Sequence, residues 1–348
     1  MTSTVSGIGE IIALLPYELG FVPADSLALV GLREGRLTVT ARLTRPGPLE
    51  VVDAARQLAA GVARSGPDEL IVLCYGGFGR SDGDFVDVLR WELDDAGVEV
   101  SHVASIDGGL WRAEHCTCGC CPLEVAQIPD ASKVEPVAEH VLRGVVPASS
   151  RAELERRFDL RHACIAQAVG QALSGGAPSH PAAGAVDQDG ADALRRVLCG
   201  TESAVHRLPV EVLAAATAAV ARITVRDYVL AWLMPDFLSP ERVLPEGLAA
   251  HYDLGPPPLR TRDEATFDDP VADVAGRLEE WVACLPREHS VPVLMLIAGI
   301  QWTIGSGVLA MLAVERALAI DPECRLAQLF AVAVRSGLRP HRGEQRPA

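Results

Sequence analysis

The run ELIVLCY, from Glu69 to Tyr75, decides the fold of the N-terminal part of this 348-residue chain. Its apolar residues follow one another without alternation, which is typical of a strand buried on both faces of a sheet. A helical pattern follows over residues 84–96, and a second apolar strand is expected over residues 98–106. A strand, a helix and a strand joined by short connections predict a right-handed crossover and a sheet that is at least partly parallel.

The segments around this crossover extend the α/β pattern. An apolar helix is expected over residues 8–15, ended by Pro16 and Gly20. Two strands joined by a hairpin turn, an amphipathic helix and a short edge strand are expected at residues 27–32, 37–43, 49–64 and 110–112. Residues 1–145 are therefore predicted to form an α/β domain with a mixed, partly parallel sheet.

The second part of the chain has a helical period. Helices are expected over residues 151–173, 191–198, 209–234 and 271–285. We predict a helical region over residues 146–262, with a mobile loop near 174–190 that is rich in Gly, Ala, Pro and Ser. A second helical region is predicted over residues 263–338 and a disordered tail over 339–348.

The last helices carry a pattern of small residues. The spacing of Ala298, Trp302, Gly305 and Ala310, closed by Asp321-Pro322, is similar to the helix-turn-helix of a tetratricopeptide repeat. One such unit is present, whereas a solenoid needs about three to bury its faces. A helical subdomain docked on the sheet and a peptide-binding groove both fit this pattern, and the groove predicts a protein partner for the C-terminal helices.

Charge and hydropathy exclude some classes of partner. The formal net charge is −15, and an acidic chain repels phosphate backbones and anionic lipid, so we expect no nucleic-acid partner. Residues 290–314 carry no charge, but Gly305-Ser306-Gly307 divides them into two helices too short to span a bilayer. The N-terminus does not read as a signal peptide, and the odd number of cysteines predicts a reducing cytoplasm.

The cysteines give the best lead to chemistry. Four of the nine, Cys116, Cys118, Cys120 and Cys121, lie in the run HCTCGCC that begins at His115. Cys118 and Cys121 have the spacing with which one turn offers two thiolates to zinc, and the others can add ligands. Four ligands within seven residues would force a cramped backbone, so zinc is expected to need distant ligands. No second C-x-x-C pair is present, and the nine histidines show no metal-ligand spacing.

Two other interpretations of these cysteines remain open. The segment Cys118-Gly119-Cys120-Cys121 could close a redox-active disulfide, and a vicinal bridge between Cys120 and Cys121 would be strained. No clear helix N-terminus follows to lower a thiol pKa. The thiols could equally be structural. The sequence leaves metal, redox and structural roles as alternatives.

A small-ligand site is the other candidate. The loop with Gly77, Gly79, Arg80 and Ser81 follows the strand at 69–75, where ligands bind in open α/β sheets, and its amides could hold an anionic group. Asp25 and Ser26 precede a buried strand and could place a carboxylate and a hydroxyl beside Tyr17. A glycine turn and a capped turn are the structural alternatives for these two segments. Trp111 completes the predicted lining of this ligand site. No catalytic motif is recognisable in the sequence, and the catalytic residues are unknown.

Several motifs resemble a bacterial family. They are LLPYELGFVPADSL at 14–27, DGGLW at 107–111, CCP at 120–122 and AVERAL at 313–318. The chain resembles, over nearly its whole length, the domain-of-unknown-function family 4192, found mainly in actinobacteria. The resemblance implies a cytoplasmic α/β domain with a helical C-terminal half and supplies no activity. Cys116 and Cys118 are additions to the family's cysteine pair, so it implies no zinc site.

Taken together, these observations favour a cytoplasmic binding or regulatory protein without catalysis. The alternative is an enzyme or small-ligand-binding protein with a pocket between the 76–81 loop, Asp25 and Ser26, and the segment from Trp111 to Cys121.

Overall fold

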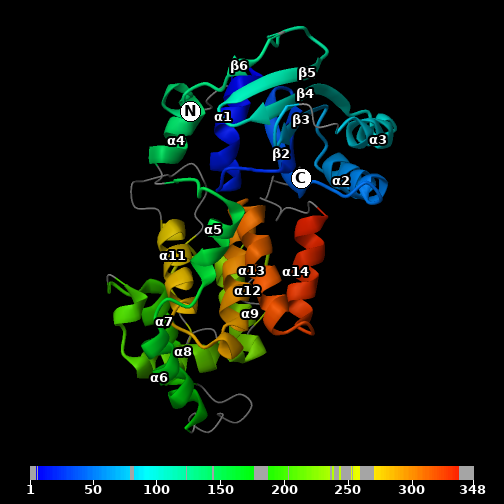
Figure 1. Cartoon of the computed structure of the whole chain (residues 1–348). Helices are drawn as coiled ribbons and strands as arrows, with labels where there is room; N and C mark the ends of the chain where they lie inside the picture. Colours follow the sequence, from blue (N-terminus) through cyan, green and yellow to red (C-terminus); the bar gives the residue numbers. More distant parts are fainter. Residues whose placement is uncertain are drawn as a thin grey trace, which may run out of the picture. The chain divides into compact units, whose positions relative to one another are not determined.

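The computed structural model describes the larger part of the chain, in two compact units. The described residues are 5, 7–78, 82–122, 124–142, 145–175, 187–202, 204–235, 237–238, 243, 252, 254–258 and 270–336. One unit consists mainly of Met1–Leu154 and the other mainly of Glu155–Val334 (Figure 1). The loop predicted to be mobile near 174–190 lies largely outside the described residues, as does the tail predicted to be disordered over 339–348.

A single mixed sheet organises the first unit. Its strands are β1 (Ser26–Arg33), β2 (Arg36–Thr44), β3 (Glu69–Tyr75), β4 (Glu99–Asp107), β5 (Leu110–Cys116) and β6 (Ala126–Gln127). They lie in the order β2-β1-β3-β4-β5-β6, with β3 and β4 parallel and the other neighbours antiparallel. The predicted fold class, a mixed and partly parallel α/β sheet followed by a helical region, is confirmed.

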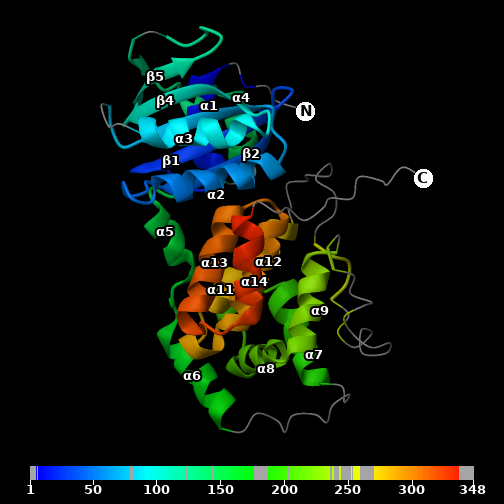
Figure 2. The same ribbon diagram turned by 90° about the vertical axis from the view of Figure 1, so that its right-hand side faces the viewer.

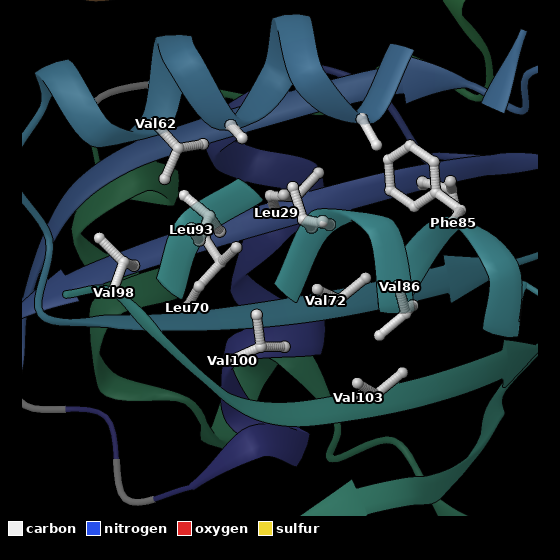
Figure 3. Close-up of a cluster of buried hydrophobic side chains, with 14 of the residues drawn as sticks. Leu29, Val62, Leu70, Val72, Phe85, Val86, Leu93, Val98, Val100 and Val103 are labelled. Atoms are coloured by element: carbon white, nitrogen blue, oxygen red, sulfur yellow. The ribbon is translucent and has the colours of Figure 1, made fainter. Parts of the chain in front are cut away.

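Helices cover both faces of this sheet. On one face, α2 (Val51–Arg64) and α3 (Gly83–Asp94) bury a core with alternate residues of β1, β3 and β4 (Figures 2 and 3). Leu29, Leu70 and Leu89 are fully buried there. The opposite face is covered by α1 (Ile8–Leu19), which packs on α4 (Glu135–Leu142) through Leu14 and Val137. Burial on both faces explains why β3 is apolar along its whole length.

The first helix is longer than its sequence predicts. Pro16 lies inside α1 and does not end it, and the helix continues to Leu19. Gly20 ends the helix in the left-handed region at φ 80°, where a glycine has no steric penalty. Burial of Leu15 and Leu19 against the sheet outweighs the backbone hydrogen bond that proline cannot donate.

The second unit is built from helices. They are α6 (Ala163–Ser174), α7 (Gln188–Cys199), α8 (Val210–Ala221), α9 (Ile223–Leu233), α11 (Pro270–Val282), α12 (Val291–Thr303), α13 (Gly307–Ile320) and α14 (Arg325–Arg335); short α5 (Arg151–Glu155) precedes them. Every residue of α12 from Val293 to Trp302 is buried, because α8, α9, α11 and α13 all pack on it. A helix that is apolar all round belongs in the centre of such a bundle.

Two breaks distinguish the observed helices from the expected ones. The helix expected over 209–234 is two helices, because Arg222 adopts an extended ψ of 123° and donates to Asp187 and to the hydroxyl of Tyr252. The expected helix 151–173 is likewise divided between α5 and α6. The apolar segment 290–314 breaks at Gly305, as predicted. Among the described residues, no helix is both long and apolar enough to cross a bilayer.

Replacing Gly31 by alanine is expected to destabilise the α/β unit by about 1–3 kcal/mol. Gly31 lies in β1, and a Cβ there would be 2.5 Å from Cγ1 of Val39 and 3.1 Å from Cβ of Pro67. Valine on a strand has little rotational freedom with which to withdraw. Urea unfolding measures the effect, with Gly109→Ala as the control because that position has open space. Equal losses in the two variants would contradict the prediction.

Candidate metal centre

The hairpin formed by β4 and β5 brings a histidine next to the cysteine run. His102 pairs directly with Cys116 across the two antiparallel strands. One irregularity sets this register: Glu114 is an extra residue of β5 relative to β4. Such bulges re-aim side chains. Here it places His102 and Cys116 opposite one another, so that both project from the same face of the sheet. Ser101, just before His102, is an extra residue of β4 relative to β3.

The turn after β5 returns the remaining cysteines to the same place. The amide of Thr117 donates to the carbonyl oxygen of Ser101 at 3.0 Å, which keeps the chain alongside β4. Gly119 then adopts φ 66°, in the left-handed region, and allows a tight reversal. Cys120 and Cys121 follow, and the backbone N–H of Cys121 donates to the sulfur of Cys116. This reversal makes room for several ligands within a short run.

One ligand atom from each of four residues lies in a compact group. The Nε2 or Nδ1 atom of His102 and the sulfurs of Cys116, Cys120 and Cys121 all lie within 4.8 Å of one another. Sγ of Cys116 is 3.8 Å from that of Cys120, which is 4.0 Å from that of Cys121. Nε2 of His102 is 3.4 Å from the sulfur of Cys120. Cys118 supplies a fifth donor, 3.7 Å from the sulfur of Cys116 and 3.5 Å from Nε2 of His102.

These separations match the edges of a zinc tetrahedron. Zinc–sulfur and zinc–nitrogen bonds of about 2.3 and 2.05 Å at the tetrahedral angle place sulfurs about 3.8 Å apart and a sulfur about 3.6 Å from a nitrogen. A disulfide, by contrast, requires about 2.05 Å between sulfurs, and all nine cysteines are free. The His102, Cys116, Cys120 and Cys121 side chains can therefore hold a metal ion such as zinc.

The far side of the imidazole is also anchored. His102 is 7% exposed, and its Nδ1 lies 2.8 Å from Oγ of Ser101 and 3.4 Å from Oε1 of Glu69. The Ser101 hydroxyl donates in turn to Oε1 of Glu69 at 2.6 Å. A hydrogen-bonded Nδ1 leaves Nε2 as the ligand atom and fixes the ring, the arrangement typical of metal-binding histidines.

The thiols influence one another's ionisation. Burial raises the pKa of Cys116, but hydrogen bonds from neighbouring cysteines, first the backbone N–H of Cys121, lower it to about 6. The pKa of Cys120 is raised, first by its hydrogen bond with Cys118. Burial is also the main cause that raises the pKa of Cys121 to about 11. One thiolate shared among several thiols is the state expected without a cation, and a divalent cation would ionise the others.

The ligand-site candidates from the sequence fall at the other end of the same hairpin. Asp25 lines a cavity there, and Gly77 lies beside the carboxylate of Asp107. Ser26 is fully buried at the start of β1, and Trp111 is 5% exposed under Gly9 of α1. Gly79, Arg80 and Ser81 lie outside the described residues. The segment after Trp111 leads away from this cavity to the cysteines, so the structure separates segments that the sequence placed in one pocket.

His102 is the ligand that the sequence did not reveal. It lies fourteen positions before Cys116, well outside the run HCTCGCC. The available signal was the turn at Asp107-Gly108-Gly109, about which a hairpin pairs residues near 102 with residues near 116. His115, which the sequence offered as a ligand, is exposed and pairs with Val103, so it projects from the other face.

The fold and the cluster define a class: an α/β sheet protein with a His/Cys group suited to a metal, followed by a helical bundle. Within that class, the chain belongs to the family described as Domain of unknown function (DUF4192), whose model matches residues 9–244 and 253–341. The family predicted from the sequence motifs is thereby confirmed. No curated protein and no solved structure matches the chain.

Proposed function

We propose that this protein is a non-catalytic zinc-binding protein, in which His102, Cys116, Cys120 and Cys121 hold one zinc ion. The observation that carries the proposal is the compact group of one nitrogen and three sulfurs within 4.8 Å of one another, in which three distances, 3.4, 3.8 and 4.0 Å, lie close to the edges of a zinc tetrahedron. Ligands from four side chains close the coordination sphere, as in structural zinc sites, whereas catalytic sites keep a position open. The zinc joins the turn after β5 to β4.

Elemental analysis of the full chain, purified in reductant without chelator, tests this assignment. The expected content is about one zinc per chain, and cobalt(II) in its place should give sulfur-to-metal charge-transfer absorption. His102→Ala should lose the metal during gel filtration, and Cys116→Ser should do the same. His115→Ala and Cys164→Ser are the controls, because both residues are exposed and lie outside the cluster.

Each other outcome points to a different role. Zinc retained equally by His102→Ala and wild type would remove the histidine from the ligand set and overturn the proposal. Wild type without metal would overturn it too; a disulfide within residues 116–121 in mass spectra would then favour the redox interpretation. If Cys118→Ser loses zinc and Cys120→Ser retains it, the fourth ligand is the sulfur of Cys118 and not that of Cys120.

The cellular role that fits this proposal is binding or regulation. Thiolate ligands need a reducing compartment, which supports a cytoplasmic location. The helical unit can supply the partner surface: Leu329 and Val332 of α14 are 59% and 64% exposed and share one helix face. We also place α12 and α13 as a tetratricopeptide-like pair. Capture of the same partners by wild type and by a Leu329→Glu, Val332→Glu variant would contradict a role for this surface.

A further inference from the structure

A cavity lies at the end of the sheet that the zinc cluster does not occupy. It has a volume of about 580 Å³ and opens where β3 and β4 end, at Gly76 and Asp107. Ile12 and Tyr17 of α1 form one side of it. Because β3 and β4 are parallel neighbours, their carboxyl ends meet at this edge, which is where open α/β sheets bind ligands. The volume is in the range of small-molecule sites.

One residue of the cavity wall carries a buried hydroxyl without a partner among the described residues. Tyr75 is 6% exposed, lines the cavity, and its hydroxyl makes no hydrogen bond to any described residue. The Ser26 hydroxyl, at the start of neighbouring β1, is fully buried and also has no partner among the described residues. Burial raises the pKa of Tyr75, which keeps its hydroxyl neutral. A buried hydroxyl without a partner is costly, and a polar group of a ligand would satisfy it.

Charge limits what can enter. The ionisable groups of the lining other than tyrosine are the carboxylates of Asp25 and Asp107. Asp25 lies 3.7 Å from Nε of Arg45, whereas Asp107 has no ion pair with a described residue. The amides of Gly76 and Gly77 both donate to the carbonyl of Ile106, at 3.3 and 3.2 Å, so they do not face outward as an anion site. The anion-binding loop expected from the sequence is therefore not formed by these two glycines.

We propose that this cavity binds a small organic cation, a protonated amine on an apolar body. The ammonium group pairs with Asp107 at the mouth, and the body lies against Ile12, Ile128 and Pro129. The Tyr75 hydroxyl accepts from the amine or from a donor on the body. This site is independent of the zinc cluster: Asp107 lies five positions after His102 in β4, about 17 Å along a strand.

Binding of 2-phenylethylamine to the full chain tests the proposal. Ligand-observed NMR and a chemical-shift titration report its dissociation constant, with 2-phenylethanol and 3-phenylpropionate as the neutral and anionic probes of similar shape. The amine should bind saturably, the alcohol more weakly and the carboxylate not at all. Asp107→Asn should raise the dissociation constant for the amine severalfold, because the ion pair with this exposed carboxylate is lost.

Two further variants keep the result interpretable. Asp53→Asn removes a carboxylate that is 90% exposed on α2, away from the cavity, and should leave binding unchanged. Tyr75→Phe keeps the ring and should weaken binding severalfold if the hydroxyl contacts the ligand. No saturable binding of the amine, equal binding by Asp107→Asn, or binding of the carboxylate as tight as that of the amine would overturn the proposal. The zinc assignment would stand in every case, because metal content is measured separately.

Discussion

Removal of zinc is expected to lower the free energy of unfolding of the α/β unit by about 4 kcal/mol, when free zinc stands at about a thousand times its dissociation constant before chelation. Zinc binds the folded arrangement of His102 and the three cysteines and not the open hairpin, so its binding free energy stabilises the fold. The rest of the unit has its own core around β3 and should stay folded. Hydrogen exchange measures the effect by region.

The exchange pattern distinguishes a local metal effect from general damage by the chelator. The peptide that contains β5 and Thr117, whose amide donates to Ser101, should lose protection on chelation and regain it when zinc is returned. The peptide of α12, in the other unit, should be unchanged. Chelator should have no further effect on His102→Ala. Loss of protection in α12 equal to that in β5 would contradict the prediction.

The fold was largely predictable from the periodicity of the apolar residues along each segment. The unbroken apolar run that follows Glu69, from Leu70 to Tyr75, indicates a strand covered on both faces, and the structure has helices on both faces of β3. Where local pattern and tertiary packing disagree, packing decides. Pro16 is accommodated within α1 because the helix buries Leu19, and Arg222 divides α8 from α9 because Asp187 and Tyr252 hold its side chain.

Only the cysteines of the candidate metal site could be predicted from the sequence, and the histidine could not. The cysteines are neighbours in sequence, and their clustering was visible. His102 joins them through strand pairing, and the pairing depends on the extra residue at Glu114. A shift of one residue in such a ladder moves a side chain to the other face. Without that bulge Cys116 would pair with Ser101 and face away from His102, and no rule of sequence spacing predicts where bulges occur.

The largest effect expected in the helical unit comes from Arg277. This arginine of α11 is 6% exposed, and its guanidinium donates to the carbonyl oxygens of Arg196, Val197 and Glu202 at 2.8, 2.7 and 2.8 Å. The first two carbonyls belong to the last turn of α7, where the dipole favours a cation. The carbonyl of Arg196 also accepts from the amide of Gly200 at 3.2 Å, so the guanidinium is its second donor. One side chain thus ends α7 and fixes it to α11.

Replacing Arg277 by methionine is expected to destabilise the helical unit by about 2–4 kcal/mol, because the stem still packs while one buried and two partly buried carbonyls lose the guanidinium donor. Arg277→Lys should recover little of this loss, since a single ammonium cannot reproduce the planar fork of a guanidinium. Arg316→Met is the control: its ion pair with Asp159 is about two-fifths exposed, and such pairs contribute about 0–1 kcal/mol.

Calorimetry of the full chain measures these losses of stability. Scans with and without chelator show which of the two unfolding transitions belongs to which unit. The transition that zinc removal leaves unchanged is that of the helical unit, and Arg277→Met should lower its temperature while the zinc-dependent transition stays in place. A small shift for Arg277→Met, no larger than that for Arg316→Met, would mean that water replaces the guanidinium at the end of α7. Full recovery by lysine would mean that charge alone, and not the three-fold hydrogen bonding, holds α7 to α11.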